Sequence, residues 1–209
     1  MNEETILTGI RKALDESPER NFTQTVEINI NFEGVNVQGE HKINSSVVLP
    51  KGRGREFEVG FFADGDMMER AKKISSHVLG SPEIEEYAKD RGKMKSFANA
   101  CGAFVAQPDL MPLIGKSWGV VLGPRNKMPQ PVPPNADLEP VLQRLINTVK
   151  LRTRKSPLLH APVGTEDMTP EDLYENIKIV LNEIEKVIPL EHVKSMYVKT
   201  TMGPAVKAW

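Results

Sequence analysis

The sequence lacks several features that define whole classes of proteins. It has a single cysteine, Cys101, so it cannot form an internal disulfide, and this is typical of proteins that fold in a reducing cytosol. No apolar run approaches the length that a membrane-spanning helix needs. The N-terminus is acidic and has no apolar stretch, so we expect no signal peptide. We therefore expect a cytoplasmic protein with no membrane partner.

The residue patterns of common enzyme sites are missing as well. The four histidines show no metal-ligand spacing to one another or to Cys101, so we expect no metal site. Residues 62–66 occupy the place of a dinucleotide-binding loop between a strand and a helix. They lack the glycine run and carry two acids where a pyrophosphate would lie, which favours an ordinary strand–helix turn. We expect no catalytic residue and no cofactor.

The sequence has almost no excess charge of either sign. Its net charge is −1, which argues weakly against nucleic acid as a partner. Basic residues nevertheless gather in loop-like stretches, at 51–55, 89–95, 125–127 and 150–155, while acidic residues gather in helix-like stretches. A neutral protein can therefore still present a basic or polar face. For any one cluster, ordinary solvated surface charge explains the pattern equally well.

The pattern of apolar residues changes twice along the chain. Hydrophobic residues make up 39% of it, enough for a packed core, and its length allows one large domain or two small ones. Residues 54–148 read as strand, helix, helix, strand, which favours parallel pairing. We predict an α+β split domain, residues 1–53 and 149–209, with an inserted α/β (Rossmann-like, three-layer) domain at 54–148.

The two ends of the chain carry clear signals for their elements. A helix is expected between Asn2, its cap, and Pro18, and another begins at Thr169, which is followed by proline and two carboxylates. Residues 25–31 alternate between apolar and polar side chains, which predicts a strand of a sheet with one open face. Further strands are expected at about 43–49, 150–154 and 158–163, and at the end of the chain.

Shorter signals divide the middle of the chain. We expect a strand at 57–63, then a helix that includes Met67 and Val78, then a helix capped by Ser81 with proline at its first position. A buried strand is expected at 100–106. Residues 115–134 are rich in glycine and proline and are expected to be mostly loop. Asp137 is expected to cap the last helix of this part.

The final strand and the turn that ends it, SMYVKTTMGP at 195–204, have the most informative pattern. Hydroxyls and an ammonium alternate with Met196 and Val198, so they share one strand face: Ser195, Tyr197, Lys199 and Thr201. Such groups can donate hydrogen bonds to phosphate or ribose oxygens. Met202-Gly203-Pro204 then breaks the strand. We expect the glycine to let a partner's backbone come close, and the proline to prevent further pairing.

Three other stretches are candidates for function. Prolines stiffen residues 123–134, a loop that presents Arg125 and Lys127, so little entropy would be lost on binding a polyanion; a structural connector is an equal alternative. Phe22 stands at a strand edge, where an aromatic ring can pack on a ribose or base, although core phenylalanines are commoner. Residues 51–55 form a glycine-rich crossing between domains.

These stretches also carry a resemblance to a known family. The terminal signature resembles that of the ribosomal protein L-one family, found in the mobile stalk of the large ribosomal subunit. Further matching stretches occur in the same order along the chain: 21–24, 48–50 with Gly52, 109–112, 123–125 with 127–129, and 160–164. The likeness is to the archaeal branch. Asn126 stands where the family usually has glycine, and asparagine tolerates the left-handed conformation.

The resemblance implies what the protein does and where. It implies a non-enzymatic constituent of the cytoplasmic ribosome, with two domains that open and close, and a monomer when free. Implied partners are large-subunit ribosomal RNA, exit-site tRNA, whose release it assists, and its own mRNA, which it represses. Residues matching the family's RNA surface, together with two on the polar strand faces, give the expected RNA-binding set: Phe22, Thr25, Glu27, Ser195, Lys199, Thr201, Met202 and Gly203. Arg125 and Lys127 are expected as a secondary RNA contact.

The segments that cross between the two domains are expected to allow motion. Gly52 and Gly54 are expected to form a hinge, because glycine absorbs large backbone rotations, and residues 150–154 are expected to form its second strand. An α/β enzyme that binds a small phosphorylated ligand at the strand ends of the inserted domain is the main alternative function. A protein-interaction scaffold is the other.

Overall fold

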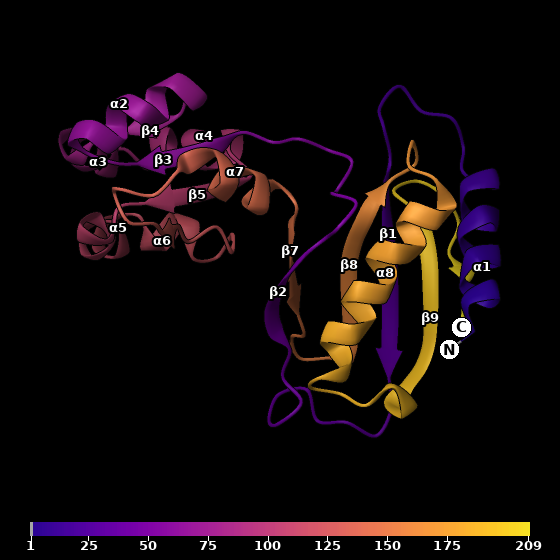
Figure 1. Ribbon diagram of the computed structural model, residues 1–209. Coiled ribbons are helices and arrows are strands. Elements are labelled where there is room, and N and C mark those ends of the chain that lie inside the picture. Colours follow the sequence, from indigo (N-terminus) through magenta and orange to yellow (C-terminus); the bar gives the residue numbers. More distant parts are fainter. Residues whose placement is uncertain (1) are drawn as a thin grey trace. The chain divides into compact units, whose positions relative to one another are not determined.

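The computed structural model describes residues 2–209 and has mixed α/β content. Its residues fall into two compact units, which we call the split unit, Met1–Arg55 with Asn147–Trp209, and the inserted unit, Glu56–Ile146. Two four-stranded sheets and one two-stranded sheet are present in the part of the chain that the structure describes (Figure 1). None of the helices in residues 2–209 is long and apolar enough to cross a membrane.

The split unit is built on an antiparallel sheet with the strand order β10-β9-β1-β8. Its strands are β1 (Thr25–Phe32), β8 (Leu158–Thr165), β9 (Val193–Thr200) and β10 (Val206–Lys207). Helices α1 (Glu3–Asp15) and α8 (Pro170–Glu185) pack against the sheet, as Figure 1 shows, and the short helix η2 (Leu190–His192) precedes β9. Strands β2 (Asn44–Val48) and β7 (Thr148–Arg152) pair separately as a ribbon.

Period-two alternation explains why this sheet has one buried face and one open face. Val26, Ile28 and Ile30 are fully buried, while the residues between them are partly exposed. The helices contribute the other half of the core through apolar stripes, such as Leu173, Ile177, Val180, Leu181 and Ile184 of α8. The predicted half-buried strand at 25–31 is confirmed, and its open face is free to carry polar groups.

One of the two predicted caps in the split unit makes its expected bond. Thr169 accepts a hydrogen bond from the backbone nitrogen of Asp172 at 3.2 Å, and Pro170 opens α8 as expected. Asn2 lies at the cap of α1 but makes no side-chain bond there, so its capping role is wrong. Helix α1 ends at Asp15, before Pro18.

A parallel sheet organises the inserted unit, with the strand order β4-β3-β5-β6. Its strands are β3 (Val59–Phe62), β4 (Val78–Leu79), β5 (Ala103–Ala106) and β6 (Gln130–Pro131). Its helices are α2 (Gly65–Ile74), α3 (Ser81–Ala88), α4 (Arg91–Ala100), η1 (Pro108–Leu110), α5 (Met111–Ser117), α6 (Gly119–Leu122) and α7 (Leu138–Ile146). The parallel pairing of the strands predicted near 57–63 and 100–106 is confirmed.

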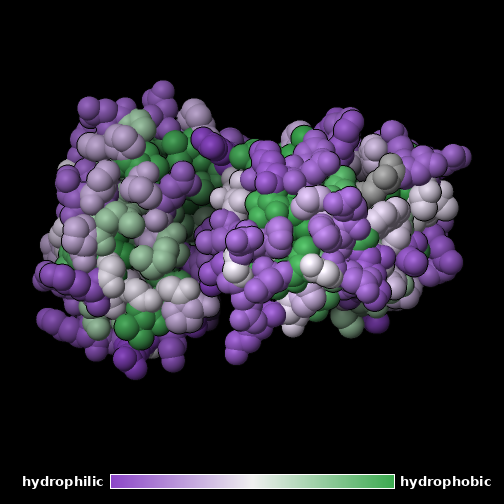
Figure 2. Space-filling model, turned by 90° about the horizontal axis from the view of Figure 1, so that it is seen from below, coloured by the Kyte–Doolittle hydropathy of each residue, from purple (hydrophilic) through white to green (hydrophobic). Residues whose placement is uncertain are grey.

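Apolar cores form on both faces of this parallel sheet. Phe62 and Phe104 pack with Trp118 and residues of α3 to α6. Phe61 and Val105, which alternate with them, pack with residues of α2 and α7. Near-continuous hydrophobic runs in β3 and β5 follow from this double burial. On the face of the molecule in Figure 2, hydrophobic residues are interspersed among hydrophilic ones in both units.

Several local predictions for the inserted unit are wrong. Val78 lies in β4 and not in a helix, because α2 ends at Ile74. Ser81 is the first residue of α3, and Gly80 takes the cap position, where its nitrogen donates to the Glu83 carboxylate at 2.9 Å. The segment 115–134 lies largely outside helices and strands, as expected, but it also contains the end of α5, all of α6 and β6.

Candidate nucleic-acid interface

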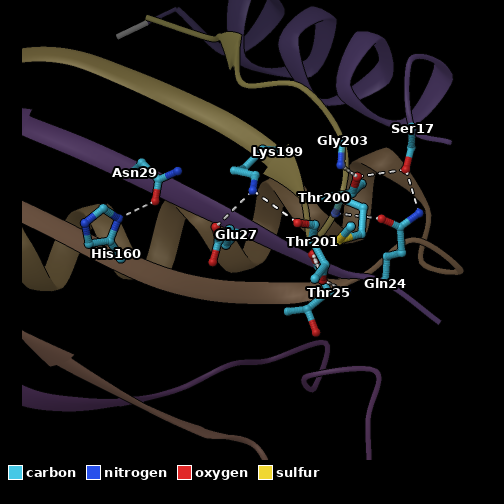
Figure 3. A network of polar contacts seen from close by, with 11 residues as sticks. Ser17, Gln24, Thr25, Glu27, Asn29, His160, Lys199, Thr200, Thr201 and Gly203 are labelled. Atoms are coloured by element: carbon cyan, nitrogen blue, oxygen red, sulfur yellow. Dashed lines mark hydrogen bonds and ion pairs between the residues drawn. The ribbon is translucent and has the colours of Figure 1, made fainter. Parts of the chain in front are cut away.

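The terminal turn lies at the end of β9, beside the start of β1, so two distant chain segments meet there. The backbone nitrogen of Thr25 donates to the Thr201 hydroxyl at 3.0 Å, and that hydroxyl is 3.4 Å from the Thr25 carbonyl (Figure 3). Phe22 is 50% exposed and Met202 is 54% exposed. Phe22 is thus not a core residue. A large aromatic and a thioether stand in solvent at this end of the sheet.

The open face next to the turn carries one ion pair. Lys199 and Glu27 are opposite each other on β9 and β1, with 3.8 Å between Nζ and Oε1. The same ammonium donates to the carbonyl of Thr201 at 3.2 Å (Figure 3). Lys199 is therefore held by groups of the split unit, and its side chain contacts the turn. Its charge is largely balanced by Glu27, so this site has little net positive charge.

Farther along the open face, polar side chains bind one another. Ser195 is only 8% exposed and accepts from the Asn31 amide at 2.8 Å. His160 Nδ1 lies 2.5 Å from the Asn29 Oδ1 atom (Figure 3), so the two side chains bridge β8 and β1. Ser195 lies on the expected strand face, but its hydroxyl is already engaged. Of the expected residues, those at the turn are the accessible ones.

Sequence reasoning missed Gln24, which lies beneath the turn. Its side chain is fully buried and its Oε1 accepts from the Met202 nitrogen at 2.9 Å. Its backbone nitrogen and Nε2 both donate to the Glu166 carboxylate, at 2.7 and 3.0 Å. A signal for it existed: Gln24 is in phase with Val26 and Ile28, so alternation alone assigns it to the buried face.

Gly203 is constrained from inside the protein. A Cβ atom there would lie 2.3 Å from Oγ1 of Thr200, too close for any side chain. The nitrogen of Gly203 donates to that same hydroxyl at 3.1 Å. The sequence suggested that this glycine lets a partner approach. The structure gives it a second reason, since the turn packs on Thr200.

Arg125 and Lys127 lie in the inserted unit, in the segment after α6. Lys127 donates to the carbonyls of Ala98 and Cys101, at 2.8 and 2.7 Å, and so satisfies the C-terminal end of α4. Burial lowers its pKa. Arg125 is exposed and donates to the Val121 carbonyl at 3.1 Å. Lys127 thus has a structural role, whereas a contact of either residue with RNA stays a prediction.

Asn126, between these two cations, has a φ of +57°, in the left-handed region. Its nitrogen donates to the carbonyl of Gly123 at 3.0 Å, which closes the turn. Asparagine therefore keeps the conformation for which the matching family usually has glycine.

The glycine-rich crossing begins in a tightly held segment of the split unit. Gly52 and Gly54 have φ values of +72° and +67°, which other residues rarely adopt. Buried Asn176 accepts from the Lys51 nitrogen at 3.1 Å and donates to the Gly52 carbonyl at 2.9 Å. The ammonium of Lys51 is 3.2 Å from the Asp172 carboxylate, a contact that raises the pKa of Lys51. The pKa of Asp172 is lowered by the Thr169 hydroxyl and by Lys51.

The second crossing lies close to the predicted hinge segment at 150–154. Residues 150–152 belong to β7, which pairs with β2 inside the split unit, and the division between units falls between Ile146 and Asn147. A hinge role for residues 150–154 stays a prediction.

The supposed ligand position at the end of β3 is filled by the protein itself. The Asp64 carboxylate accepts from the Ser81 nitrogen at 2.9 Å and from its hydroxyl, which joins β3 to the start of α3. The nitrogen of Asp64 donates to Gln107 at 2.8 Å. This carboxylate repels phosphate, so the geometry disfavours the alternative of a phosphorylated ligand here.

The sequence as a whole matches a known family. Residues 13–204 match the ribosomal protein L1p/L10e family. The chain belongs to this family. It is 42% identical over 206 residues to the large ribosomal subunit protein uL1 of Methanobrevibacter smithii, which covers 97% of both chains. It is 44% identical to the uL1 protein of Methanothermococcus thermolithotrophicus, over 98% of this chain and 97% of that one.

The predicted likeness to the archaeal branch is confirmed by these relatives. The uL1 protein of Archaeoglobus fulgidus adds a third, 42% identical over 99% of this chain and 98% of its own. The family match ends at residue 204, so it includes the whole terminal turn of β9. The turn and the residues around it therefore lie within the matched region.

Proposed function

We propose that this protein is a constituent of the large ribosomal subunit that binds ribosomal RNA through the terminal turn of its split unit. Its relatives are named large ribosomal subunit proteins, and this chain matches them over nearly their full length. The observation that carries the proposal is that Phe22 and Met202 are both exposed, while the chain segments that hold them are joined by the bond from the Thr25 nitrogen to the Thr201 hydroxyl. Bases and riboses of folded RNA stack on such groups and bind such hydroxyls.

The charge at the site bears on how RNA is bound. Lys199 is paired with Glu27, and its ammonium also binds the Thr201 carbonyl. A paired cation releases few counterions when RNA arrives, so the affinity depends weakly on salt. The Glu27 carboxylate repels phosphate, yet it can accept from a ribose 2′-hydroxyl, which favours RNA over DNA. Shape and hydroxyl contacts thus explain how a chain of net charge −1 binds RNA.

Wider roles follow from the family and are part of the proposal. The two units act as domains, an α+β split domain and a Rossmann-like, three-layer inserted domain. On the cytoplasmic ribosome the protein assists the release of exit-site tRNA, and it represses its own mRNA through an RNA element that mimics the ribosomal site. It is a monomer when free, and it performs no catalytic step.

Motion between the two domains is also part of the proposal. Asn176 fixes Lys51 and Gly52 within the split unit, so we place the pivot after Gly52 on one crossing and at Ile146–Asn147 on the other. Dye labels on the two units should report a distance distribution that changes when RNA is added. One fixed distance in both conditions would exclude a mobile hinge.

A binding assay tests the proposal against the enzyme alternative. The purified protein is titrated with a transcribed fragment of large-subunit ribosomal RNA from the stalk region, and with inorganic phosphate and nucleotides in parallel. We expect saturable binding of the RNA at nanomolar to sub-micromolar concentration and none of the small phosphates. Binding of a small phosphate without retention of the RNA would overturn the proposal.

A further inference from the structure

We propose that Gln24 is a positioning residue, which holds the terminal turn in the shape that RNA recognises before RNA arrives. This inference rests on the proposed function. Gln24 touches no solvent, because its side chain is fully buried. It acts through the backbone of Met202, whose exposed side chain is offered to the RNA.

The amide of Gln24 joins segments from three parts of the chain. Its Nε2 lies within hydrogen-bond distance of three acceptors, which share its two hydrogens: the Ser17 hydroxyl at 2.9 Å, the Pro18 carbonyl at 2.8 Å and the Glu166 carboxylate at 3.0 Å. The carbonyl and the carboxylate can only accept, so the NH₂ group faces them. The Oε1 atom is thereby turned towards Met202, and the orientation of the amide follows from its surroundings.

A second set of bonds holds the turn from the other side. The Thr200 hydroxyl accepts from the Gly203 nitrogen at 3.1 Å and lies 2.7 Å from the Ser17 hydroxyl. Ser17 in turn accepts from Gln24. The bonds therefore form a closed ring through Gln24, Met202, Gly203, Thr200 and Ser17, most of which is visible in Figure 3. Breaking one bond releases only part of the turn, while Gln24 contributes two bonds of the ring.

This arrangement determines what the turn offers to RNA. The nitrogens of Met202 and Gly203 are both satisfied within the protein, so they are not donors to phosphate. The side chains of Thr201 and Met202 remain exposed, as does that of Phe22, which precedes β1. A turn that is already ordered loses little conformational entropy on binding, and this raises its affinity for RNA.

Glutamine is the residue type that satisfies all four partners of this amide. A glutamate at 24 keeps an acceptor for Met202 but brings a second carboxylate against Glu166 and the Pro18 carbonyl, and like charges repel. An asparagine is one methylene shorter and cannot span the distance from Glu166 to Met202. A leucine would leave the Met202 nitrogen and the Ser17 hydroxyl without this partner.

The test uses the full chain with Gln24→Glu, Glu166→Gln and both together. We expect Gln24→Glu to weaken binding of the stalk RNA fragment by about tenfold or more, since it disrupts charge-assisted bonds in a buried site. The double variant restores a carboxylate–amide pair in reversed order and should regain part of the affinity. Gln38→Glu is the matched control, because Gln38 is exposed and lies beyond the other end of β1; it should bind as the unmodified protein does.

A second measurement reads the turn without RNA. Amide hydrogen exchange of Met202 and Gly203 should become faster in Gln24→Glu and slow again in the double variant, at a temperature well below unfolding. A purely structural role would lower the melting temperature without these changes in the remaining folded protein. Gln24→Asn, a neutral variant with the same groups, takes the place of Gln24→Glu if the latter does not fold.

The outcomes separate the two proposals. If the unmodified protein fails to bind the RNA, the proposed function is wrong, and the exchange rates alone decide whether Gln24 holds the turn. If it binds, and folded Gln24→Glu binds equally well with unchanged exchange at Met202, the positioning role of Gln24 is refuted.

Discussion

At the scale of single residues, the proposed interface depends on short groups rather than on long cations. The Thr201 hydroxyl binds both backbone groups of Thr25, and so it joins the turn to the first strand. Lys199 is engaged with Glu27 and with the Thr201 carbonyl. Removing the Thr201 hydroxyl and removing the Lys199 ammonium should therefore affect RNA binding differently, and one assay can compare the two.

Thr201→Ala should weaken RNA binding more than Lys199→Ala does. An RNA group that is buried against this hydroxyl on binding would lose its partner, which costs about 1–3 kcal/mol, and the dependence on salt should not change. Lys199→Ala removes a cation that is already paired with Glu27, so it should cost less affinity and change the weak salt slope only slightly. Binding at several salt concentrations, with melting temperatures for both variants, measures this. Thr8→Ala, on the exposed side of α1, is the control. A lower melting temperature with full affinity would remove Thr201 from the site.

Cys101 provides a chemical probe of the inserted unit. The thiol is fully buried, and burial with repulsion from Glu58 raises its pKa to about 11. Alkylation proceeds through the thiolate, so we expect very slow reaction with iodoacetamide at pH 8 in the native protein and rapid reaction in denaturant. The raised pKa also means that the folded state keeps this proton longer, so stability should fall as the pH rises from 9 towards 11. Rapid native labelling would show that the unit opens.

At the scale of elements, the sequence predicts those helices and strands in which polar and apolar residues recur with a regular period. Alternation identified β1 and its open face, and the threonine–proline–acid signal located the start of α8. The same alternation assigns Gln24 to the buried face, where only the fold reveals its partners Glu166 and Met202. Those partners are remote in sequence, so no local pattern could indicate them.

Elements without a full period were misread for a physical reason. β4 has two residues and α6 has four, so neither completes a pattern that distinguishes strand from helix. Glycine and proline near residues 115–134 suggested loop, but burial of Trp118, Val121 and Leu122 stabilises helices there. Tertiary packing overrode local propensity, as it often does in short segments.

Asn176 should contribute strongly to the stability of the first crossing, which begins at residues 51 and 52. It is fully buried on α8 and bonds to Lys51, Gly52 and Val163. Asn176→Ala leaves these backbone groups without their partner, and we expect a loss of about 2–4 kcal/mol in the free energy of unfolding. Asn182→Ala, on the exposed side of the same helix, should change it by less than about 0.5 kcal/mol. Urea denaturation measures the free energy of unfolding of both variants. Equal losses in the two would contradict the role of Asn176 in holding residues 51 and 52.

At the scale of the whole molecule, we propose that RNA binding belongs to the split unit. All the residues of the turn and its supporting network belong to the split unit, and the inserted unit has its own two cores. The network bonds Gln24 to Glu166 and Met202, so it needs both ends of the chain but none of residues 56–146. The RNA contact should therefore survive without the inserted unit.

The most direct measurement is RNA binding by the split unit alone. Residues 56–146 are replaced by a short glycine linker, folding is checked by cooperative thermal unfolding, and affinity for the stalk RNA fragment is compared with that of the full chain. We predict that most of the binding free energy is retained and that Thr201→Ala weakens both forms alike. A split unit that folds but does not bind, beside a full chain that does, would contradict the assignment of the RNA site to the terminal turn.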